Sequence, residues 1–164
     1  MNRMTVVLAI VFQIGTCMSG FTFADEKESD DKGSATQRIA DQIKGKCVIL
    51  RKGPDGPYKV VKEHLGKVTR VTTYNPNNVI VYSHQSEYRI DSSGPTNVFY
   101  YKNRVVLAGP NAGDKDATER AYIFRVEGGR FIEVSGMLKD DIGPPSLKVW
   151  ERPKANDGVP ATNT

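Results

Sequence analysis

Cysteine and histidine are scarce in this chain, and their scarcity limits the chemistry that it can carry. Its 164 residues include two cysteines and two histidines. Cys17 lies in an N-terminal segment that we expect to be removed, which leaves Cys47 without a partner for an intramolecular disulfide. A zinc site built from Cys and His is excluded by count, and a metal shared by His64, His84 and a carboxylate is disfavoured. We therefore expect packing to stabilise the fold, with no metal and no other cofactor.

Sequence motifs of catalysis are missing as well. The chain has no Gly-x-Ser-x-Gly elbow, no phosphate-binding loop and no HExxH pattern. Glu63 and His64 are adjacent, so on a strand they would point to opposite faces. Cys47 opens the apolar run Cys47–Leu50, which is typical of a buried and unreactive thiol. The loop Asp114–Asp116 carries a lysine between its two acids, which favours a solvated loop over a calcium site. We therefore predict that the protein is not an enzyme.

Charged side chains are absent from residues 4–24. The stretch Thr5–Phe12 is apolar, with the length of the hydrophobic region of a signal peptide, and is too short for a spanning helix. Thr22–Ala24 places small residues where a signal peptidase reads, just before a charged run. The sequence therefore predicts a signal peptide at residues 1–24, cleaved after Ala24, and a periplasmic or secreted protein.

Two alternatives for the N-terminal segment stay open. Cys17 follows Ile14–Thr16, which loosely resembles a bacterial lipoprotein box, although threonine is unusual directly before an acylated cysteine. The segment could also stay uncleaved as a membrane anchor. Contact with a membrane is expected only in these two cases. All three interpretations place the folded part outside the cytoplasm.

The chain carries a formal net charge of +4 at pH 7. A basic protein can bind anionic polymers or membrane headgroups. Here the lysines and arginines are scattered along the candidate strands rather than clustered, which favours an ordinary solvated surface. Export also makes nucleic acid a poor candidate partner. We expect no nucleic-acid binding, and no pattern in the sequence indicates a particular oligomeric state.

The composition divides the mature chain into three parts. Residues 25–34 are charged and lack large apolar groups, so we expect a disordered linker. Residues 153–164 are small and polar, which predicts a disordered tail. The segment 35–152 between them is large enough for one domain with a single core.

A short amphipathic helix is predicted at the start of this domain. Ser34 and Gln37 have the spacing of a capping box. Apolar residues up to Ile43 fall on one helical face, and Gly45 is placed to end the helix. We therefore expect a helix over about residues 35–44.

From Lys46 onward the side chains alternate with a period of two, which is typical of strands. Glycine, proline and asparagine clusters separate the runs, and Asn103 is expected to be a tight turn between two of them. The candidate strands are 47–50, 58–64, 67–74, 79–91, 98–102, 104–108, 120–126, 130–135 and 147–152. No helical pattern separates any pair, so parallel pairing is disfavoured, and closing the sheet would remove its edges. The sequence predicts a mainly β fold: an antiparallel up-and-down barrel of eight or nine strands with the helix across one end.

Short motifs along residues 43–152 resemble the lipocalin-like small barrels of exported bacterial proteins. These motifs are Gly45-x-Cys47, Lys62-Glu63-His64 with Thr69–Tyr74, Ala108-Gly109-Pro110-Asn111, Tyr122–Val126 and Val149-Trp150-Glu151-Arg152. Lipocalins usually carry a tryptophan on the first strand, packed beneath an arginine of the last strand. In this chain Cys47 stands at the position of the tryptophan, which departs from the pattern, and Arg152 stands at the position of the arginine. The resemblance implies a barrel that could hold a small apolar molecule.

Aromatic side chains of the central strands supply the candidate pocket. Tyr82, His84 and Tyr88 share one face of the strand 79–91 and form the best candidate wall. The full predicted set is Tyr82, His84, Tyr88, Tyr100, Tyr122 and Phe124. As a base or metal ligand, His84 is disfavoured relative to a barrel-lining residue. Two functions stay open: a module that binds a small apolar or amphipathic ligand, and a structural or interaction protein of the cell envelope with a filled barrel.

Overall fold

The computed structural model describes residues 26–139, 141 and 143–153. The predicted signal peptide and all but the first residue of the predicted tail therefore lie outside the described residues. The elements are α1 (Glu26–Ile43), β1 (Gly45–Gly53), β2 (Gly56–Leu65), β3 (Val68–Tyr74), β4 (Ile80–Asp91), β5 (Asn97–Ala108), β6 (Lys115–Asp116), β7 (Arg120–Glu127), β8 (Arg130–Ser135) and β9 (Ser146–Glu151).

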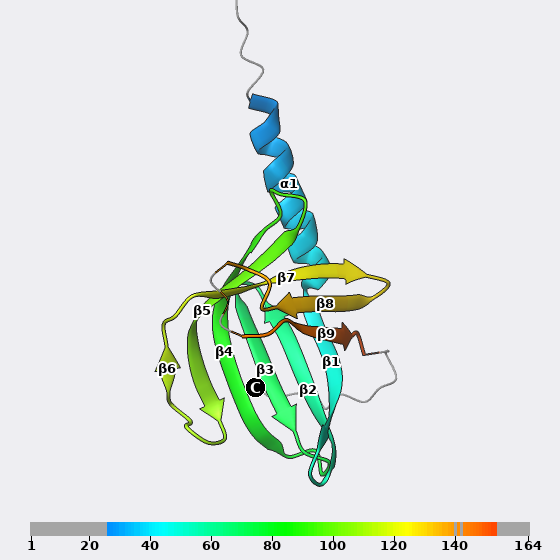
Figure 1. Cartoon of the computed structure of the whole chain (residues 1–164), viewed down its shortest axis with the longest axis vertical. Coiled ribbons are helices and arrows are strands. Elements are labelled where there is room, and N and C mark those ends of the chain that lie inside the picture. The colour runs from blue at the N-terminus through cyan, green and yellow to red at the C-terminus, as the bar shows by residue number, and fades with distance from the viewer. Residues whose placement is uncertain (1–25, 140, 142, 154–164) are drawn as a thin grey trace, which may run out of the picture.

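Eight of these strands form a closed antiparallel barrel (Figure 1). The strand order is β4-β3-β2-β1-β9-β8-β7-β5-β6, and a further pairing of β4 with β5 closes the ring. Each strand of the ring therefore lies beside its neighbours in sequence, and β6 is a short addition to the second half of β5. This confirms the predicted antiparallel up-and-down barrel preceded by a helix.

The two neighbours of β1 in the ring pair with it over very different lengths. β1 pairs with β2 along its whole length, from Gly45 to Gly53. On its other side, β1 pairs with β9 at one position, between Val48 and Glu151. The seam between the first and last barrel strands is thus held by far fewer ladder hydrogen bonds than the other seams.

The helix is longer than the sequence predicts. α1 begins at Glu26, so it includes most of the segment that we expected to be a disordered linker, and the prediction of a helix start at residue 35 is wrong. The physical reason lies in composition: glutamate and lysine favour helices, and acidic residues near a helix N-terminus interact well with its dipole. Gly33 is tolerated inside the helix. α1 ends at Ile43, and Gly45 follows with a φ of 99°, in the left-handed region where glycine is favoured.

Only the C-terminal part of α1 contacts the barrel, and the rest projects away from it rather than lying across the end (Figure 1). Ile43 is buried in the core, with Ile39 packed against it. Arg152, just after β9, donates hydrogen bonds to the carbonyl oxygens of Gln42 and, at 3.3 Å, Lys44. A cation that binds the last carbonyls of a helix stabilises that end. No helix in the described part of the chain is long and apolar enough to span a membrane.

Asn103 does not reverse the chain, which corrects a second expectation. β5 runs without interruption from Asn97 to Ala108. Asn103 has a φ of 53°, and the register with β4 shifts between Gln85 and Glu87. This is a β-bulge, which bends a long strand. A single residue cannot make the turn of a hairpin, because the shortest common hairpin loops contain two residues.

A cluster of buried aromatic and aliphatic side chains forms the core and reaches the α1 end of the barrel, where Ile43 joins it. Phe99, only 1% exposed, stacks on Tyr88 at 4.8 Å and on Tyr122 at 4.9 Å between ring centroids. Phe124 and Phe131 pack against it edge-on. The cluster also contains Ile43, Cys47, Val60 and Trp150. This apolar plug closes one end of the barrel.

Candidate functional site

The half of the barrel away from α1 encloses a cavity of about 340 Å³. Side chains from all eight barrel strands line it. They come from the inward-facing positions of the strands, as in Val60 and Lys62 on β2, or Thr69, Val71 and Thr73 on β3. The period-two pattern that predicts the fold is thus also what aims these side chains at one another. We call this space the barrel cavity.

The floor of the barrel cavity is a buried charge network. Lys62 and Glu133 form an ion pair, and Glu133 also accepts a hydrogen bond from Lys148 Nζ at 2.7 Å. Lys62 Nζ donates to the hydroxyl of Tyr122 at 3.3 Å and lies 4.5 Å from the centroid of the Trp150 ring. One carboxylate, one hydroxyl and aromatic faces therefore stabilise an ammonium group deep in the barrel.

Burial and charge act in opposite directions on this network. Burial lowers the pKa of Lys62 below its ordinary value, and the charge of Glu133 counteracts part of that change. For Glu133, burial alone would raise the pKa, but the ammonium groups of Lys62 and Lys148 outweigh burial and hold the pKa below its ordinary value. Glu133 is therefore ionised at neutral pH and holds two lysines at once.

The open end of the cavity is cationic along one side of its wall. Arg51 on β1, Lys148 on β9, Arg120 on β7 and Arg104 on β5 all line it. These strands are consecutive around the ring, apart from β8, which contributes Ser135 at the same end. Outside the ring, the carboxylate of Asp116 on β6 lies 3.0 Å from the guanidinium of Arg120 and 3.7 Å from that of Arg104. One acid is thus shared by two arginines.

The opposite side of the wall is uncharged. It consists of Val60, Thr73, Tyr82 and His84, from β2, β3 and β4. Burial first, and the charges of Arg104 and Lys62 second, lower the pKa of His84 to about 4. His84 is therefore neutral at pH 7, and the ring of Tyr82 lies 5.5 Å from it.

Several residues that line the barrel cavity have a buried polar atom without a hydrogen-bond partner among the described residues. These atoms include the hydroxyls of Thr69 and Ser86 and the indole Nε1 of Trp150. Thr69 is 7% exposed, and Ser86 and Trp150 are each 2% exposed. Buried polar groups in folded proteins almost always have a protein or water partner. These atoms have almost no accessible surface, so they are unsatisfied within the wall rather than exposed in the cavity.

The predicted pocket residues divide into three groups. Tyr82, His84 and Tyr122 line the barrel cavity. Tyr88 and Phe124 belong instead to the apolar plug at the α1 end. Tyr100 points outward, where the guanidinium of Arg89 covers its ring at 3.6 Å. The structure therefore does not bring Tyr100 into the cavity wall, because its neighbours Phe99 and Tyr101 in β5 occupy the inward positions.

The structure adds cavity-lining residues to the predicted pocket set. Phe99, Tyr101 and Trp150 line the cavity, and so do Lys62 and Glu133. Alternation alone would have identified Lys62, which shares a face with Val60 and His64 on β2. No comparable signal pairs Lys62 with Glu133, because 71 residues separate them in the sequence.

His64 and Cys47 occupy structural rather than reactive positions. Rings of Tyr88, Phe99 and Phe131 surround His64, with centroids 5.3 to 5.5 Å away. Cys47 is buried, which agrees with the prediction of a buried thiol, and burial raises its pKa to about 12. No group of three or more potential metal ligands occurs within the described residues.

His64 makes the stability of the fold sensitive to acid. Burial, and secondarily the charge of Lys62, lowers the pKa of His64 from 6.5 to about 3. Between these values the unfolded state binds the proton and the folded state does not, so stability falls as the pH decreases from 6.5 towards 3. Replacing His64 with Phe should reduce the loss of unfolding free energy between pH 7 and pH 4 by about 3 kcal/mol. Urea unfolding at both pH values measures this difference. An equal loss in both proteins would contradict a neutral His64.

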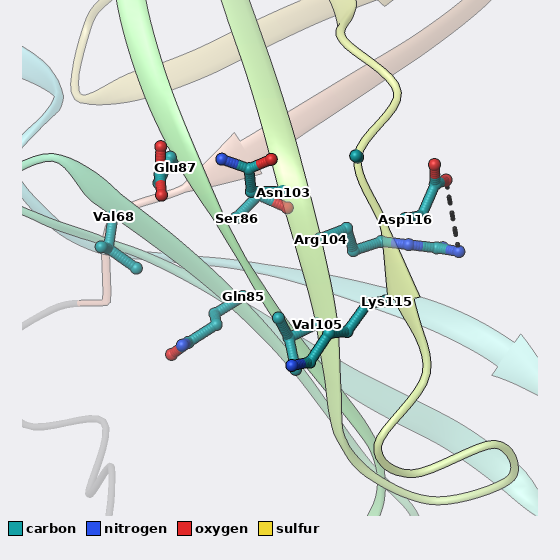
Figure 2. Close-up of a pocket in the computed structure, with 10 residues that line it drawn as sticks. Val68, Gln85, Ser86, Glu87, Asn103, Arg104, Val105, Lys115 and Asp116 are labelled. Carbon is teal, nitrogen blue, oxygen red and sulfur yellow. Dashed lines mark ion pairs between the residues drawn. The ribbon is translucent and has the colours of Figure 1, made fainter.

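A second, outer groove of about 420 Å³ lies where β6 leaves β5, beside the bulge (Figure 2). Figure 2 shows Arg104 extending from β5 towards Asp116 on β6, with Lys115 below. Glu87 and Gln85 of β4 line its other side. Charges of both signs are mixed here, and both Arg104 and Ser86 line this groove as well as the barrel cavity. The outer groove is thus separated from the cavity only by the wall at the bulge.

Comparisons of the chain with protein-family models, with curated proteins and with solved structures found no match, so the similarity to exported lipocalin-like barrels stays a prediction from the sequence.

Proposed function

We propose that this protein is exported and that its barrel binds a small amphipathic molecule through the end away from α1. The observation that carries the proposal is the barrel cavity itself, a space that side chains from all eight barrel strands line but do not fill. Its volume of about 340 Å³ falls at the lower end of the range typical of ligand sites. A compact ligand therefore suits it better than a long lipid chain.

The lining of the cavity supports an amphipathic rather than a purely apolar ligand. Phe99, Tyr101 and Trp150 offer aromatic surface, whereas Thr69 and Ser86 offer hydroxyls. Pockets for small molecules typically combine a largely apolar lining with a few polar groups that fix the orientation of the ligand. A ligand with both kinds of surface would cover the rings and contact partly exposed hydroxyl residues of the wall such as Thr73 and Ser135.

The alternative function requires a barrel whose interior is filled and which acts only through its outer surface. Only the α1 half of the barrel has such a filled interior. The α1 half is packed by the aromatic plug. The other half leaves a cavity of about 340 Å³, which apolar, aromatic and polar side chains line. Since Lys62 and Glu133 are paired with each other at the floor, they are better suited to shaping a binding site than to exchanging protons with a substrate. Binding is thus favoured over both a purely structural role and catalysis.

A cavity-filling substitution tests the proposal. Val71 lines the cavity between Lys62 on β2 and His84 on β4. Replacing Val71 with Phe should reduce the occupancy of a small molecule by about tenfold or more, because the added ring takes the space of the ligand. Native mass spectrometry of protein purified without denaturant from the cells that make it measures the occupancy and also the mass of the mature chain, which should correspond to cleavage after Ala24.

Two further variants make the result decisive. Leu107→Phe introduces the same ring on the exterior of β5, where Leu107 is exposed, and should bind as the wild type does. Thr73→Phe fills the cavity nearer its open end and serves if Val71→Phe does not fold. The absence of any bound molecule in the wild type, or equal occupancy in the filled and control variants, would contradict the proposal.

A further inference from the structure

The barrel cavity carries an excess of positive charge. Five cationic side chains line it: Arg51, Lys62, Arg104, Arg120 and Lys148. Within the described residues, the carboxylates in contact with them are those of Glu133 and Asp116. Five cations against two carboxylates leave three positive charges unbalanced. Lys62 is buried, whereas Arg51 and Arg120 are exposed at the rim, so the surplus charge lies where a ligand can reach it.

The surplus is concentrated at the open end. Lys62 at the floor has its own counterion, Glu133, whereas Arg104 and Arg120 share the single carboxylate of Asp116. Arg51 makes no ion pair with any described residue. Guanidinium groups are suited to binding planar oxyanions through two parallel hydrogen bonds. The open end is therefore complementary to a negatively charged oxygen group.

The rest of the cavity fits an uncharged body below that group. The wall opposite the cations is formed by Tyr82 and Val60, which lie at one level of the sheet, and by His84 one step closer to the floor. Tyr101 and Tyr122 add rings from β5 and β7, and the plug of Phe99 closes the space towards α1. A ligand that enters with its apolar end first would leave its polar end among the arginines.

We propose that the ligand of this cavity is a compact amphipathic anion, with an aromatic or apolar body and one carboxylate or sulfonate group bound by Arg51, Arg120 and Lys148 at the open end of the barrel. This inference rests on the proposed function and narrows it to a class of ligand. The small volume and the closed α1 end exclude a long acyl chain. The positive surplus also raises the rate at which anions reach the cavity.

A matched pair of probes tests the charge requirement. The anion 8-anilinonaphthalene-1-sulfonate and the neutral N-phenyl-1-naphthylamine share one ring system and differ by the sulfonate. Binding of both to the full-length protein is followed by fluorescence titration at neutral pH. The wild type should bind the anion more tightly than the neutral probe, by a factor on the order of ten. Added salt should weaken the binding of the anionic probe and leave that of the neutral probe unchanged, since screening acts on charge pairs.

Single charge removals locate the anion. Arg51→Gln and Arg120→Gln should each weaken the sulfonate probe several-fold, up to about tenfold, and leave the neutral probe unchanged. Arg51→Gln breaks no ion pair of the fold, so its effect cannot come from a lost internal contact. The control is Arg89→Gln, which removes a positive charge from the outer face, where Arg89 lies on Tyr100. This control should bind both probes as the wild type does.

The outcomes separate the inference from the function on which it rests. If Val71→Phe weakens both probes but the wild type binds them equally, the cavity binds ligands and the anion inference fails. The inference also fails if Arg51→Gln and Arg120→Gln leave the affinity for the sulfonate probe unchanged. If Val71→Phe and Thr73→Phe, once folded, change neither probe, the binding lies elsewhere and the proposed function itself fails.

Discussion

Replacing Glu133 with Leu is expected to lower the free energy of unfolding by about 3 to 5 kcal/mol. Glu133 is the buried counterion of Lys62 and also binds Lys148. Without it, the ammonium of Lys62 would be left uncompensated among aromatic rings, or would have to lose its proton. Lys148 is partly exposed and would keep contact with water. Chemical denaturation at neutral pH, followed by circular dichroism, measures the change.

Two companion variants show whether the loss comes from the unpaired charge. The double variant Lys62→Met with Glu133→Leu removes both charges and should recover most of the lost stability, because apolar pairs of similar volume replace buried ion pairs at little cost. Glu63→Gln breaks the partly exposed pair of Lys46 with Glu63, 3.4 Å apart on the outside of the barrel, and should cost less than about 1 kcal/mol. A double variant as unstable as Glu133→Leu alone would refute the explanation.

Truncation of Phe99 to Ala should lower the free energy of unfolding by about 3 to 5 kcal/mol. Phe99 lies at the centre of the aromatic plug, stacked between Tyr88 and Tyr122, and is 1% exposed. Its removal would leave a void lined by rings that cannot collapse together. The same denaturation experiment measures the effect, and native mass spectrometry would show whether the widened cavity takes up a larger ligand.

The neighbouring residue supplies a control from the same strand. Tyr100→Ala removes a ring of nearly equal size that lies on the outer face under Arg89. An exposed contact of this kind contributes about 0.5 to 1 kcal/mol, so the expected loss is several times smaller than that of Phe99→Ala. Equal losses of unfolding free energy in Phe99→Ala and Tyr100→Ala would contradict the assignment of Phe99 to the inner face and Tyr100 to the outer face of β5.

Most of the fold follows from local patterns. Alternation of side chains, interrupted by clusters such as Asn75–Asn78, predicts the strands, and the lack of helices between them predicts antiparallel pairing. Gly45 ends the helix as expected, because its φ of 99° suits glycine. The predictions at Asn103 and at the start of α1 are wrong because the local sequence there is compatible with two different structures. A single asparagine with positive φ occurs in turns and in bulges, and a charged run can be disordered or helical.

The site was harder to predict than the fold. Alternation tells which residues share a face of one strand, but not which of the two faces turns inward. It therefore cannot decide whether Tyr100 faces the interior together with Tyr82. Charge added a second difficulty, since lysine and glutamate are expected on the surface. Lys62 and Glu133 contradict that expectation because each finds its partner on another strand. Only the closed ring brings β2 and β8 face to face.

The sparse pairing of β1 with β9 has a consequence for the order in which the chain can mature. Val48 meets Glu151 only after nearly the whole barrel sequence has been synthesised, and bringing such distant positions together carries a large loop-closure entropy. Nascent chains that lack the last strand therefore cannot complete the ring. Under the export proposed above, a fold that closes last at its two ends would delay folding until the chain has passed through a secretion channel.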